Sequence, residues 1–354
     1  MHYTFPITKN ENPKPKPDPK DIGFAKYFTD HMFFMNYDDG QGWHDARIIP
    51  YGPLNLDPAA TTLHYAQEAF EGMKAYRNPE GKVNLFRPDM NAKRMRNTCE
   101  RMCIPEIDED LFISAVEELV KIDADWIPEG NGTSLYIRPF IISPELNLAP
   151  VAPKSLWFII ILAPATPYHS KVSHILVEDE YIRAAVGGTG FAKCGGNYAG
   201  ALRANIKAAK YQCDDVLWLD AKEHKYIEEV GTSNAFFVID GKVVTSPLTG
   251  SILPGVTRDS VIQLLEKWGI EVDQRRLPID EAIEAAKSGR MTEAWASGTA
   301  CVIAPMGLLN YKGTDYPING EQVGSLSKRL YDSLYGMQTG VLPDEMGNWV
   351  ITLD

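Results

Sequence analysis

The sequence predicts an α/β protein of the α+β type with two domains. Its 354 residues are more than a single hydrophobic core usually organises, which favours two domains. Segments 133–142 and 155–163 are short runs of β-branched, aromatic and aliphatic residues, which is the composition of buried strands. Segment 108–123 instead repeats apolar residues at helical spacing. Strands and amphipathic helices are therefore both expected.

The helix predicted at 108–123 has a clear start and a clear buried face. Asp108 stands at the N-cap position, where a short polar side chain can accept a backbone N–H. The apolar residues that share one face are Phe112, Ala115, Val116 and Leu119. We expect this face to pack on the strands of the first domain.

A composition change near the middle of the chain predicts the domain boundary. Segment 164–172 holds two prolines and small polar residues between strand-like runs, so we interpret it as an interdomain linker. It separates a small α/β domain at 23–163 from a large domain at 173–354. Residues 1–22 are rich in proline and lysine and predict a flexible, solvated N-terminal arm.

The second half mixes strands and helices. Asp240-Gly241 between two apolar runs is a strong signal for a β-hairpin. The expected strands are 215–220, 235–240 and 242–246, and the expected helices are 258–268, 279–288 and about 323–335. Gly269 is the expected stop of the first of these helices.

Composition narrows the functional classes. The formal charge of −12 argues against a nucleic-acid or anionic-membrane partner. The five cysteines include no CxxC pair, so neither a zinc ribbon, a metal site nor a disulfide scaffold is expected. The N-terminal stretch has no apolar core of signal-peptide length. These features predict a soluble cytoplasmic protein.

The segment VGGTGFAKCGGNYAG, residues 186–200, is the most unusual in the chain. Glycines surround Lys193 and allow both positive φ and a close backbone approach to a bound group. A solvated lysine in a glycine-rich surface loop explains the composition about equally well. A dinucleotide-binding loop fits less well, because the spacing from Gly188 lacks the third glycine of GxGxxG.

Three further segments could bind a cofactor. In EEVGTSN, residues 228–234, a carboxylate could hold a protonated pyridine nitrogen or could be a solvated turn residue. Proline and glycine at 251–260 open a helix whose N–H groups could bind phosphate, although such helix starts are common. The small residues of ASGTAC, 296–301, predict a tight turn that suits an anion or any other turn function.

Together these segments resemble the branched-chain aminotransferases, which are pyridoxal-phosphate enzymes of fold type IV. The resemblance runs from about Phe24 to the C-terminal helix. The segments that carry it are FTDHM (28–32), LHYAQEAFEGMKAY (63–76), LFRPDMNAKRM (85–95), GTSLYIRP (132–139), VGGTGFAKCGGNYAG, EVGTSN, ILPGVTR and SGTAC. Their order and spacing fit the family throughout, which is far more specific than any single motif.

The resemblance implies roles toward pyridoxal 5'-phosphate. Lys193 matches the lysine that forms the Schiff base, and Glu229 matches the carboxylate at the pyridine nitrogen. Tyr198 matches the tyrosine at the ring phenolate oxygen. The other residues implied in cofactor binding are Arg94, Arg183, Thr232, Val256, Thr257 and Thr299.

The resemblance also implies a substrate pocket and a homodimer. The expected pocket residues are Phe28, Tyr65, Phe70, Tyr136, Leu148, Thr299 and Ala300. Tyr65 and Leu148 match residues that reach into the pocket of the other subunit. Without the family match, core packing would be the simpler explanation for Phe28, Phe70 and Tyr136.

The implied reaction moves the amino group of L-leucine, L-isoleucine or L-valine to 2-oxoglutarate and yields L-glutamate. One pocket must then accept a branched apolar side chain and the γ-carboxylate of glutamate. Tyr65 and Tyr136 are the hypothesised partners of that carboxylate.

Two departures from the family pattern stand out. Some relatives carry CxxC after SGTA, whereas Val302 follows Cys301 here, which argues against a thiol–disulfide switch. Ser233 and Pro150 stand where animal members have larger apolar residues and valine, respectively, so the preference among branched-chain substrates stays open.

Three other functions are compatible with parts of the sequence. A D-amino-acid aminotransferase or an aminodeoxychorismate lyase would share the lysine and the carboxylate, but is usually shorter and lacks FTDHM. A non-enzymatic protein could keep the fold, although the intact Lys193, Glu229 and Arg94 argue against this. A dinucleotide-dependent oxidoreductase is suggested only by the glycines.

Overall fold

The computed structural model describes residues 1–130, 132–166 and 171–353, and the chain divides into two compact units. Unit 1 comprises Met1–Pro167, Ala192–Gly195 and Gly336–Asp354, and unit 2 comprises Tyr168–Phe191 and Gly196–Tyr335. Within the predicted linker at 164–172, residues 167–170 lie outside the described residues. Each unit has its own sheet and its own core, and each is described by itself.

Unit 1 is built on an antiparallel sheet, which has eight strands among the described residues. The strands are β1 (His31–Asp38), β2 (Gly42–Pro50), β3 (Glu68–Phe70), β4 (Met73–Arg77), β5 (Val83–Phe86), β6 (Ser134–Ile142), β7 (Ser155–Ala165) and β17 (Val350–Leu353). Their order is β17-β5-β4-β6-β7-β1-β2, and β3 pairs with β6. The helices are α1 (Thr61–Tyr65), α2 (Pro88–Arg101) and α3 (Glu109–Ile122), followed by a 3-10 turn at Ala124–Trp126.

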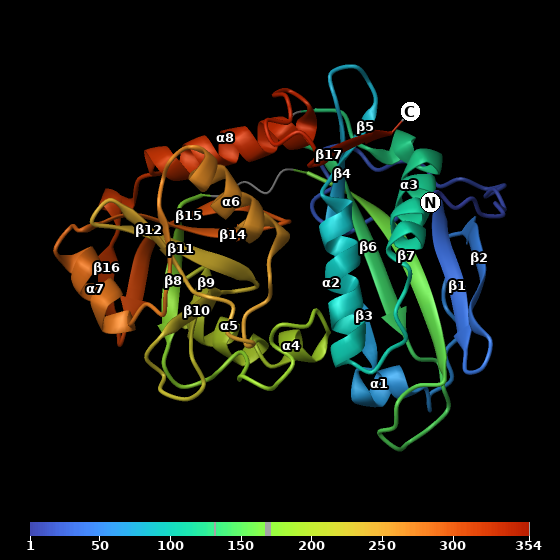
Figure 1. Cartoon of the computed structure of the whole chain (residues 1–354), viewed down its shortest axis with the longest axis horizontal. Helices are drawn as coiled ribbons and strands as arrows, with labels where there is room; N and C mark the ends of the chain where they lie inside the picture. Colours follow the sequence, from blue (N-terminus) through green and yellow to red (C-terminus); the bar gives the residue numbers. More distant parts are fainter. Residues whose placement is uncertain (131, 167–170, 354) are drawn as a thin grey trace. The chain divides into compact units, whose positions relative to one another are not determined.

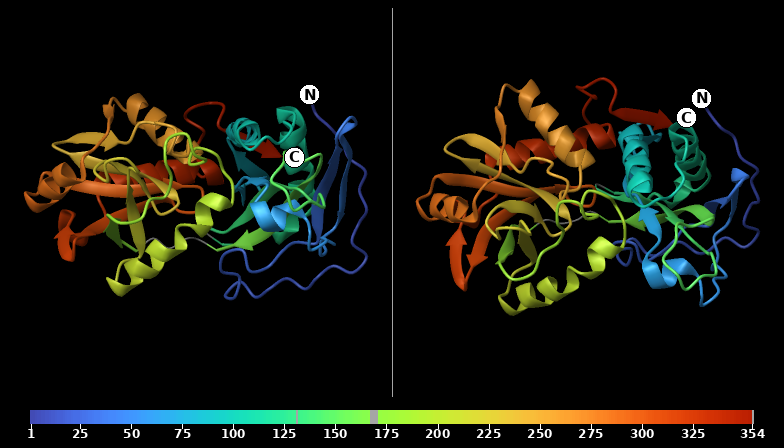
Figure 2. Two further views of the ribbon diagram at one scale, coloured as in Figure 1. Left: turned by 90° about the horizontal axis from the view of Figure 1, so that it is seen from below. Right: turned by 60° about the horizontal axis from the view of Figure 1, so that its bottom comes forward.

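The two long helices, α2 and α3, lie side by side against the sheet of unit 1 (Figures 1 and 2). The Asp108 side chain accepts the Leu111 N–H and caps α3, which confirms the predicted helix start. Phe112 on the apolar face of α3 is fully buried and stacks on Phe158 of β7 at 5.8 Å between ring centroids. The predicted strands at 133–142 and 155–163 are confirmed as β6 and β7, which pair along their length.

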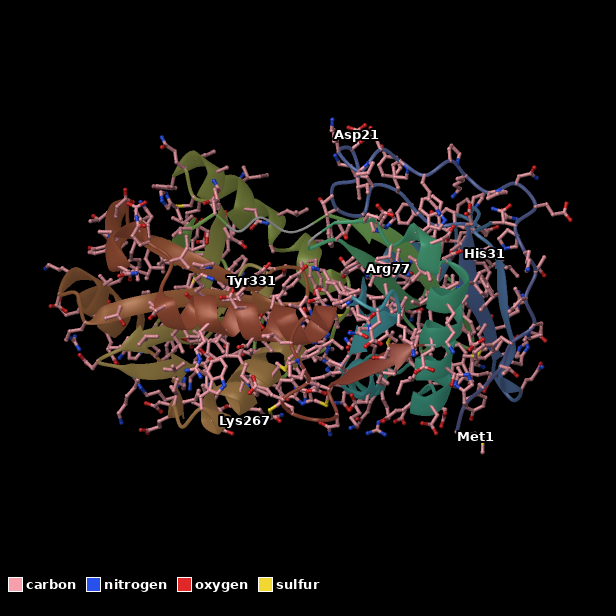
Figure 3. All side chains as sticks on the ribbon, turned by 90° about the horizontal axis from the view of Figure 1, so that it is seen from above. Met1, Asp21, His31, Arg77, Lys267 and Tyr331 are labelled. Atoms are coloured by element: carbon pink, nitrogen blue, oxygen red, sulfur yellow. The ribbon has the colours of Figure 1, made fainter. Side chains whose placement is uncertain are left out.

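The N-terminal segment follows unit 1 through specific contacts, and Figure 3 shows its side chains. Ile7 forms a bridge with Ile48 of β2, and the Asn10 N–H donates to Nε2 of His31 at 3.0 Å. The Lys14 N–H donates to Asp30 at 2.8 Å. Where the sequence predicted a solvated flexible arm, the N–H groups of Asn10 and Lys14 thus have partners at the start of β1.

Unit 2 is built on a second, mixed sheet with nine strands among the described residues. The strands are β8 (Ser173–Glu178), β9 (Asp215–Leu219), β10 (Ile227–Val230), β11 (Ser233–Ile239), β12 (Lys242–Thr245), β13 (Val272–Gln274), β14 (Met291–Gly298), β15 (Val302–Tyr311) and β16 (Thr314–Pro317). Their order is β10-β9-β8-β15-β14-β11-β12-β13, with β16 on β15. Because β10 also pairs with β11, the strands from β10 to β11 close into a ring.

The helices of unit 2 are α4 (Gly196–Ala199), α5 (Leu202–Lys210), α6 (Val256–Lys267), α7 (Ile279–Lys287) and α8 (Ser325–Thr339), with a 3-10 turn at Asn319–Glu321. The predicted helices at 258–268, 279–288 and about 323–335 are confirmed as α6, α7 and α8, whereas α4 and α5 were not predicted. The last residues of α8, from Gly336, belong to unit 1. Gly269 has φ +73° just past α6, as the predicted stop requires. The β11–β12 hairpin is also confirmed, with Asp240 at φ 51° and Gly241 at φ 77°.

Candidate active site

Lys193 lies in the short segment Ala192–Gly195, which belongs to unit 1. The chain before and after this segment belongs to unit 2. The backbone N–H of Lys193 donates to Oγ1 of Thr98 on α2 at 3.0 Å. Its carbonyl accepts the N–H of Phe70 on β3 at 3.0 Å. These two hydrogen bonds hold the backbone on either side of the lysine Cα, so the position of the side chain is set by a helix and a strand rather than by its own loop.

The glycine two residues after this lysine has a steric role. A Cβ at Gly195 would lie 1.6 Å from Oε1 of Glu68, so no larger residue fits while that carboxylate stays in place. Burial raises the pKa of Glu68, because it disfavours the ionised carboxylate. A hydrogen bond from the backbone of Gly195 acts in the opposite direction and partly offsets this effect. At this position, the glycine-rich composition reflects a close approach between chain segments.

The amine of Lys193 lies among charged and aromatic groups. Its Nζ is 4.8 Å from the centroid of the Phe70 ring. Burial and the nearby Arg94 guanidinium lower the pKa of Lys193 from 10.5 to about 8, against the opposing effects of Glu71 and Tyr136. Near neutral pH the amine is therefore unprotonated far more often than that of an ordinary lysine, which favours its use as a nucleophile or general base.

Arg94 on α2 is held by a fully buried carboxylate. Its Nε donates to Oε1 of Glu71 at 2.7 Å, and its Nη2 donates to Oε2 at 2.9 Å. Asn91 and the Gly72 N–H also donate to Oε2, at 2.7 and 3.1 Å. Burial alone would raise the pKa of Glu71, but the charge and hydrogen bonds of Arg94 lower it. Glu71 is therefore ionised in the site.

Tyr136 and Arg138 project from the same face of β6, two residues apart. Nη2 of Arg138 donates to the Tyr136 hydroxyl at 2.9 Å, and the guanidinium lies 4.8 Å from the Phe70 ring centroid. A Cβ at Gly72 would lie 2.2 Å from that hydroxyl, so the glycine leaves room for the tyrosine. Nε of Arg138 is buried without a hydrogen-bond partner among the described residues.

The remaining pocket residues predicted in unit 1 lie in two other places. Phe28 stacks on Tyr51 with their planes 6° apart and 5.3 Å between centroids. Tyr65 is 39% exposed and donates from its hydroxyl to the carbonyl of Leu148, which is 66% exposed. Tyr65 and Leu148 thus form a hydrogen-bonded pair on the surface of unit 1.

In unit 2, Glu229 on β10 is a buried and well-anchored carboxylate. Its Oε1 accepts the Leu253 N–H at 2.9 Å and the Asn234 amide at 3.2 Å. Its Oε2 lies 2.8 Å from Nε of Arg183. Two hydrogen bonds hold Oε1, and the Arg183 cation lies beside Oε2. A buried carboxylate held in this way can serve as the partner of a protonated pyridine nitrogen.

Arg183 also links the two glycine-containing segments of unit 2. Its Nη2 donates to the carbonyls of Gly190 and Ser251. A Cβ at Gly190 would lie 2.2 Å from the Ser251 carbonyl, so the two segments meet backbone to backbone. Arg183 therefore connects the glycine-rich loop, the start of the α6 segment and Glu229.

The start of α6 has the features of an anion site. The helix begins at Val256 after Gly255, which provides no side-chain cap for the first N–H groups. Val256 and Thr257 are both buried. A Cβ at Gly255 would lie 2.1 Å from Oδ1 of Asn234, so this turn also depends on glycine. The helix dipole and the first N–H groups together favour a bound phosphate.

The other residues expected in unit 2 lie at turns and at a short helix. Tyr198 is half-buried in α4, and Thr232 is exposed in the turn between β10 and β11. Thr299 and Ala300 form the turn between β14 and β15. Cys301, which follows, is a buried thiol next to Gly298, consistent with a structural position.

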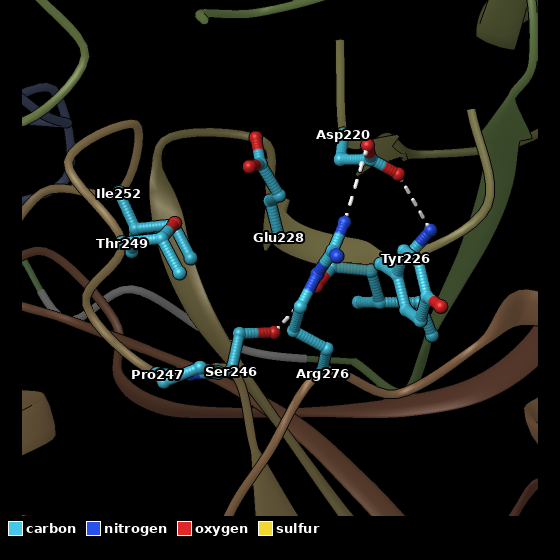
Figure 4. Close-up of a pocket in the computed structure, with 9 residues that line it drawn as sticks. Asp220, Tyr226, Glu228, Ser246, Pro247, Thr249, Ile252 and Arg276 are labelled. Atoms are coloured by element: carbon cyan, nitrogen blue, oxygen red, sulfur yellow. Dashed lines mark hydrogen bonds and ion pairs between the residues drawn. The ribbon is translucent and has the colours of Figure 1, made fainter. Parts of the chain in front are cut away.

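Glu228, the neighbour of Glu229 in β10, has different surroundings. It lines a small cavity with Asp220, Tyr226 and Arg276, shown in Figure 4, which has room for about one water molecule. Burial raises the pKa of Glu228, and its Oε1 accepts from the Ser251 hydroxyl. This cavity is too small for a pyridine ring, so of the two adjacent carboxylates only Glu229 is a candidate cofactor ligand.

Sequence reasoning missed several residues that the structure places at these sites. They are Glu71, Asn91, Thr98, Arg138, Asn234 and Ser251. A usable signal existed for Arg138, because a charged residue inside an apolar strand run demands a partner. The partners of Thr98 and Ser251 are distant in sequence and left no local signal.

Comparison with known proteins identifies the family. Residues 68–307 match the model of amino-transferase class IV. A branched-chain-amino-acid transaminase of Bacillus subtilis is 50% identical over 342 residues, which cover 96% of each protein. A solved Escherichia coli branched-chain amino acid aminotransferase has a TM-score of 0.72 at 26% identity, over 92% of this chain and 99% of that one. A solved relative from T.th., complexed with N-(5'-phosphopyridoxyl)-L-glutamate, has a TM-score of 0.71 at 25% identity, over 90% and 98%.

These relatives confirm the predicted α/β fold of type IV and the cofactor class. Each unit carries groups that suit this cofactor. Unit 1 has the Lys193 amine with a pKa of about 8 and the buried Arg94, and unit 2 has the buried carboxylate of Glu229. The chain therefore belongs to the class IV aminotransferases and, within them, to the branched-chain aminotransferases, which are pyridoxal-phosphate-dependent enzymes.

Proposed function

We propose that the protein transfers the amino group of L-leucine, L-isoleucine or L-valine to 2-oxoglutarate. The observation that carries this proposal is the lysine amine with a lowered pKa beside aromatic side chains and Arg138. The aromatic groups suit a branched apolar side chain. The glutamate adduct bound to the solved T.th. relative supports glutamate as the second amino acid.

We propose cofactor contacts for the residues that the family resemblance implied. Pyridoxal phosphate, when bound, supplies a ring that withdraws electrons from the substrate Cα. Lys193 attaches the cofactor, and its released amine moves the proton at Cα. Glu229 holds the proton at the pyridine nitrogen, with Arg183 as the cation beside its carboxylate.

The remaining proposed contacts follow from chemistry and position. Arg94 and the N–H groups of Val256 and Thr257 hold the phosphate. Tyr198 hydrogen bonds the ring oxygen, and Thr232 lies beside the cofactor. The turn at Thr299 and Ala300 binds the phosphate and the substrate carboxylate, and Phe28, Phe70 and Tyr136 form the side-chain pocket.

The visible absorption spectrum of the purified full-length protein tests this function. The band of the bound cofactor should fall when L-leucine is added and return when 2-oxoglutarate follows. D-leucine is the matched control and should leave the band unchanged. A band that ignores L-leucine would refute the substrate proposal and leave the fold and cofactor intact.

Arg138 is the residue we propose for the γ-carboxylate of glutamate and 2-oxoglutarate. It is a cation beside Tyr136 and Phe70, and its Nε has no hydrogen-bond partner among the described residues. A planar guanidinium can pair with a carboxylate through two parallel hydrogen bonds. The hydroxyl of Tyr136, as first hypothesised, would then help to orient this guanidinium rather than act alone.

Replacing Arg138 by methionine should therefore separate the two substrates. We expect the KM for 2-oxoglutarate to rise by about 10-fold to 100-fold, because a charge-assisted contact is worth roughly 1.5–3 kcal/mol. The KM for L-leucine should change by less than about threefold, since its side chain needs no cation. Arg77→Met, at an exposed arginine of the same unit, is the control. Equal changes in both KM values would contradict this assignment.

We further propose that the protein is a cytoplasmic homodimer. Tyr65 and Leu148 lie in two segments, 60–67 and 146–151, that are joined by hydrogen bonds. The same segments carry the exposed apolar residues Leu63, Leu146 and Val151, which favours burial against a second copy. Sedimentation at the mass of one chain would contradict the dimer. In the described part of the chain no helix is long and apolar enough to cross a membrane.

A further inference from the structure

Glu71 is completely buried, and both oxygens of its carboxylate accept hydrogen bonds. The residue follows β3 and is 0% exposed, and Arg94 is 6% exposed. Two of the four hydrogen bonds to its carboxylate come from Arg94, one from the Asn91 amide and one from the Gly72 N–H. A carboxylate removed from water this completely is costly unless each oxygen is paired. Its geometry is therefore tightly determined.

The bonds from Arg94 fix a direction as well as a distance. Nε and Nη2 lie on one edge of the guanidinium, and both donate to Glu71. Two parallel bonds lock the plane of an arginine that could otherwise sample many rotamers. Nη1 then lies on the edge that faces away from Glu71. The carboxylate thus determines where the charge of Arg94 is presented.

Glu71 also balances charge around the lysine amine. The groups that act on Lys193 are the cations Arg94 and Arg138, which disfavour its protonated form, and Glu71 and Tyr136, which favour it. Glu71 is the only carboxylate among these groups. If Glu71 were neutral, Arg94 and Arg138 would still disfavour the protonated amine, but the negative charge that opposes them would be lost.

We propose that Glu71 is a positioning residue that orients Arg94 toward the cofactor phosphate and offsets the charge of Arg94 beside the Lys193 amine. The proposal rests on the proposed function, because it assigns the phosphate to Arg94. It differs from a purely structural ion pair, which would stabilise the fold without changing phosphate recognition or the ionisation of the lysine.

Two substitutions separate position from charge. Glu71→Asp keeps the charge but shortens the reach to Arg94, so it tests orientation. Glu71→Gln keeps the shape but removes the charge, so it tests the balance at Lys193. Glu178→Gln is the matched control, because Glu178 is also 0% exposed and pairs with a lysine, Lys207, at 2.8 Å.

The first measurement is the affinity of the full-length apoprotein for pyridoxal phosphate and for pyridoxal, which lacks the phosphate. For Glu71→Asp we expect the preference for pyridoxal phosphate over pyridoxal to fall by about tenfold, the equivalent of one charge-assisted contact. The control should keep the wild-type preference. An unchanged preference in Glu71→Asp would overturn the orientation role.

The second measurement is the pH dependence of the rate at which pyridoxal attaches to the protein, between about pH 6 and pH 10. Pyridoxal has no phosphate, and its own ionisations are the same in every experiment, so a difference in midpoint between a variant and the wild type reports the lysine amine. Glu71→Gln should shift the midpoint to lower pH, whereas Glu71→Asp and Glu178→Gln should not. If Glu71→Gln does not fold, Glu71→Asp still decides the orientation role. A lower melting temperature with both measurements unchanged would show a structural role only.

The wild-type protein distinguishes this proposal from the proposed function. If the wild-type protein binds no pyridoxal phosphate, the function fails before Glu71 is tested. Should the wild type bind the cofactor while both Glu71 variants match it, only the role of Glu71 is overturned.

Discussion

Lys193→Ala is expected to lower kcat/KM for L-leucine by at least about 10³-fold, because it removes both the covalent anchor and the proposed base for the Cα proton. The absorption band of covalently bound cofactor should disappear with it. Lys207→Ala removes another partly buried lysine, which pairs with Glu178, and should leave both properties unchanged. A Lys193→Ala protein that retains the band would show that another amine carries the cofactor.

Substitution of this lysine has a second, pH-dependent consequence in the apoprotein. Folding lowers the pKa of Lys193 from 10.5 to about 8, so the unfolded chain binds more protons than the folded one between these values. Burying the lysine therefore costs free energy below pH 8, and the cost is relieved as pH rises toward 10.5. Lys193→Met should stabilise the apoprotein at pH 7 by on the order of 1–3 kcal/mol, less so near pH 10. Urea unfolding at both pH values measures this difference.

Glu229→Gln is expected to lower kcat by about 10²-fold to 10³-fold, because a neutral amide cannot stabilise a protonated pyridine nitrogen. The KM for L-leucine should change little, since the aromatic pocket is untouched. The substitution also leaves Arg183, which lies 2.8 Å from the carboxylate, without its anionic partner. Loss of one member of a buried ion pair should lower the free energy of unfolding by about 3 kcal/mol.

Glu228→Gln is a matched control from the same strand. Burial already raises the pKa of Glu228 and disfavours its charge, although the nearby Arg183 acts in the opposite direction. The residue lines the small cavity, and the ion pair of Arg183 is formed with Glu229 instead. This variant should keep kcat within about twofold and should not lose stability at neutral pH. If both variants lost activity equally, general disturbance of β10 would explain the result and the role of Glu229 would fail.

Local sequence patterns were sufficient for those helices and strands that carry a clear apolar period or turn signal. The period of the apolar residues in α3 matches its buried face, and Asp108 caps it as predicted. The Asp240-Gly241 pair adopts the two positive φ values that its hairpin needs. These features depend on neighbours within a few residues, so the information for them lies in the local sequence.

The two candidate chemical centres, Lys193 and Glu229, could be predicted from the sequence for a different reason. Lys193 and Glu229 sit in short segments whose composition is unusual, and the order of all such segments resembles one family. The family then predicted their roles without any knowledge of the fold. The contacts around these two residues could not be predicted from the sequence. Gly195, for example, could equally belong to a solvated loop, and only the structure shows that it packs against Glu68.

By itself, the sequence determined the fold class, the family and several of the elements, and it predicted the residues that bear the chemistry. The tertiary structure decided which side chains surround these residues and how far they shift the pKa of Lys193. It anchored Lys193 to Thr98, 95 positions away, and surrounded its amine with Arg94 and Glu71. Hydrogen bonds and charges act over a few ångströms regardless of sequence separation, so the pKa of a lysine depends on which distant side chains the fold brings within that distance.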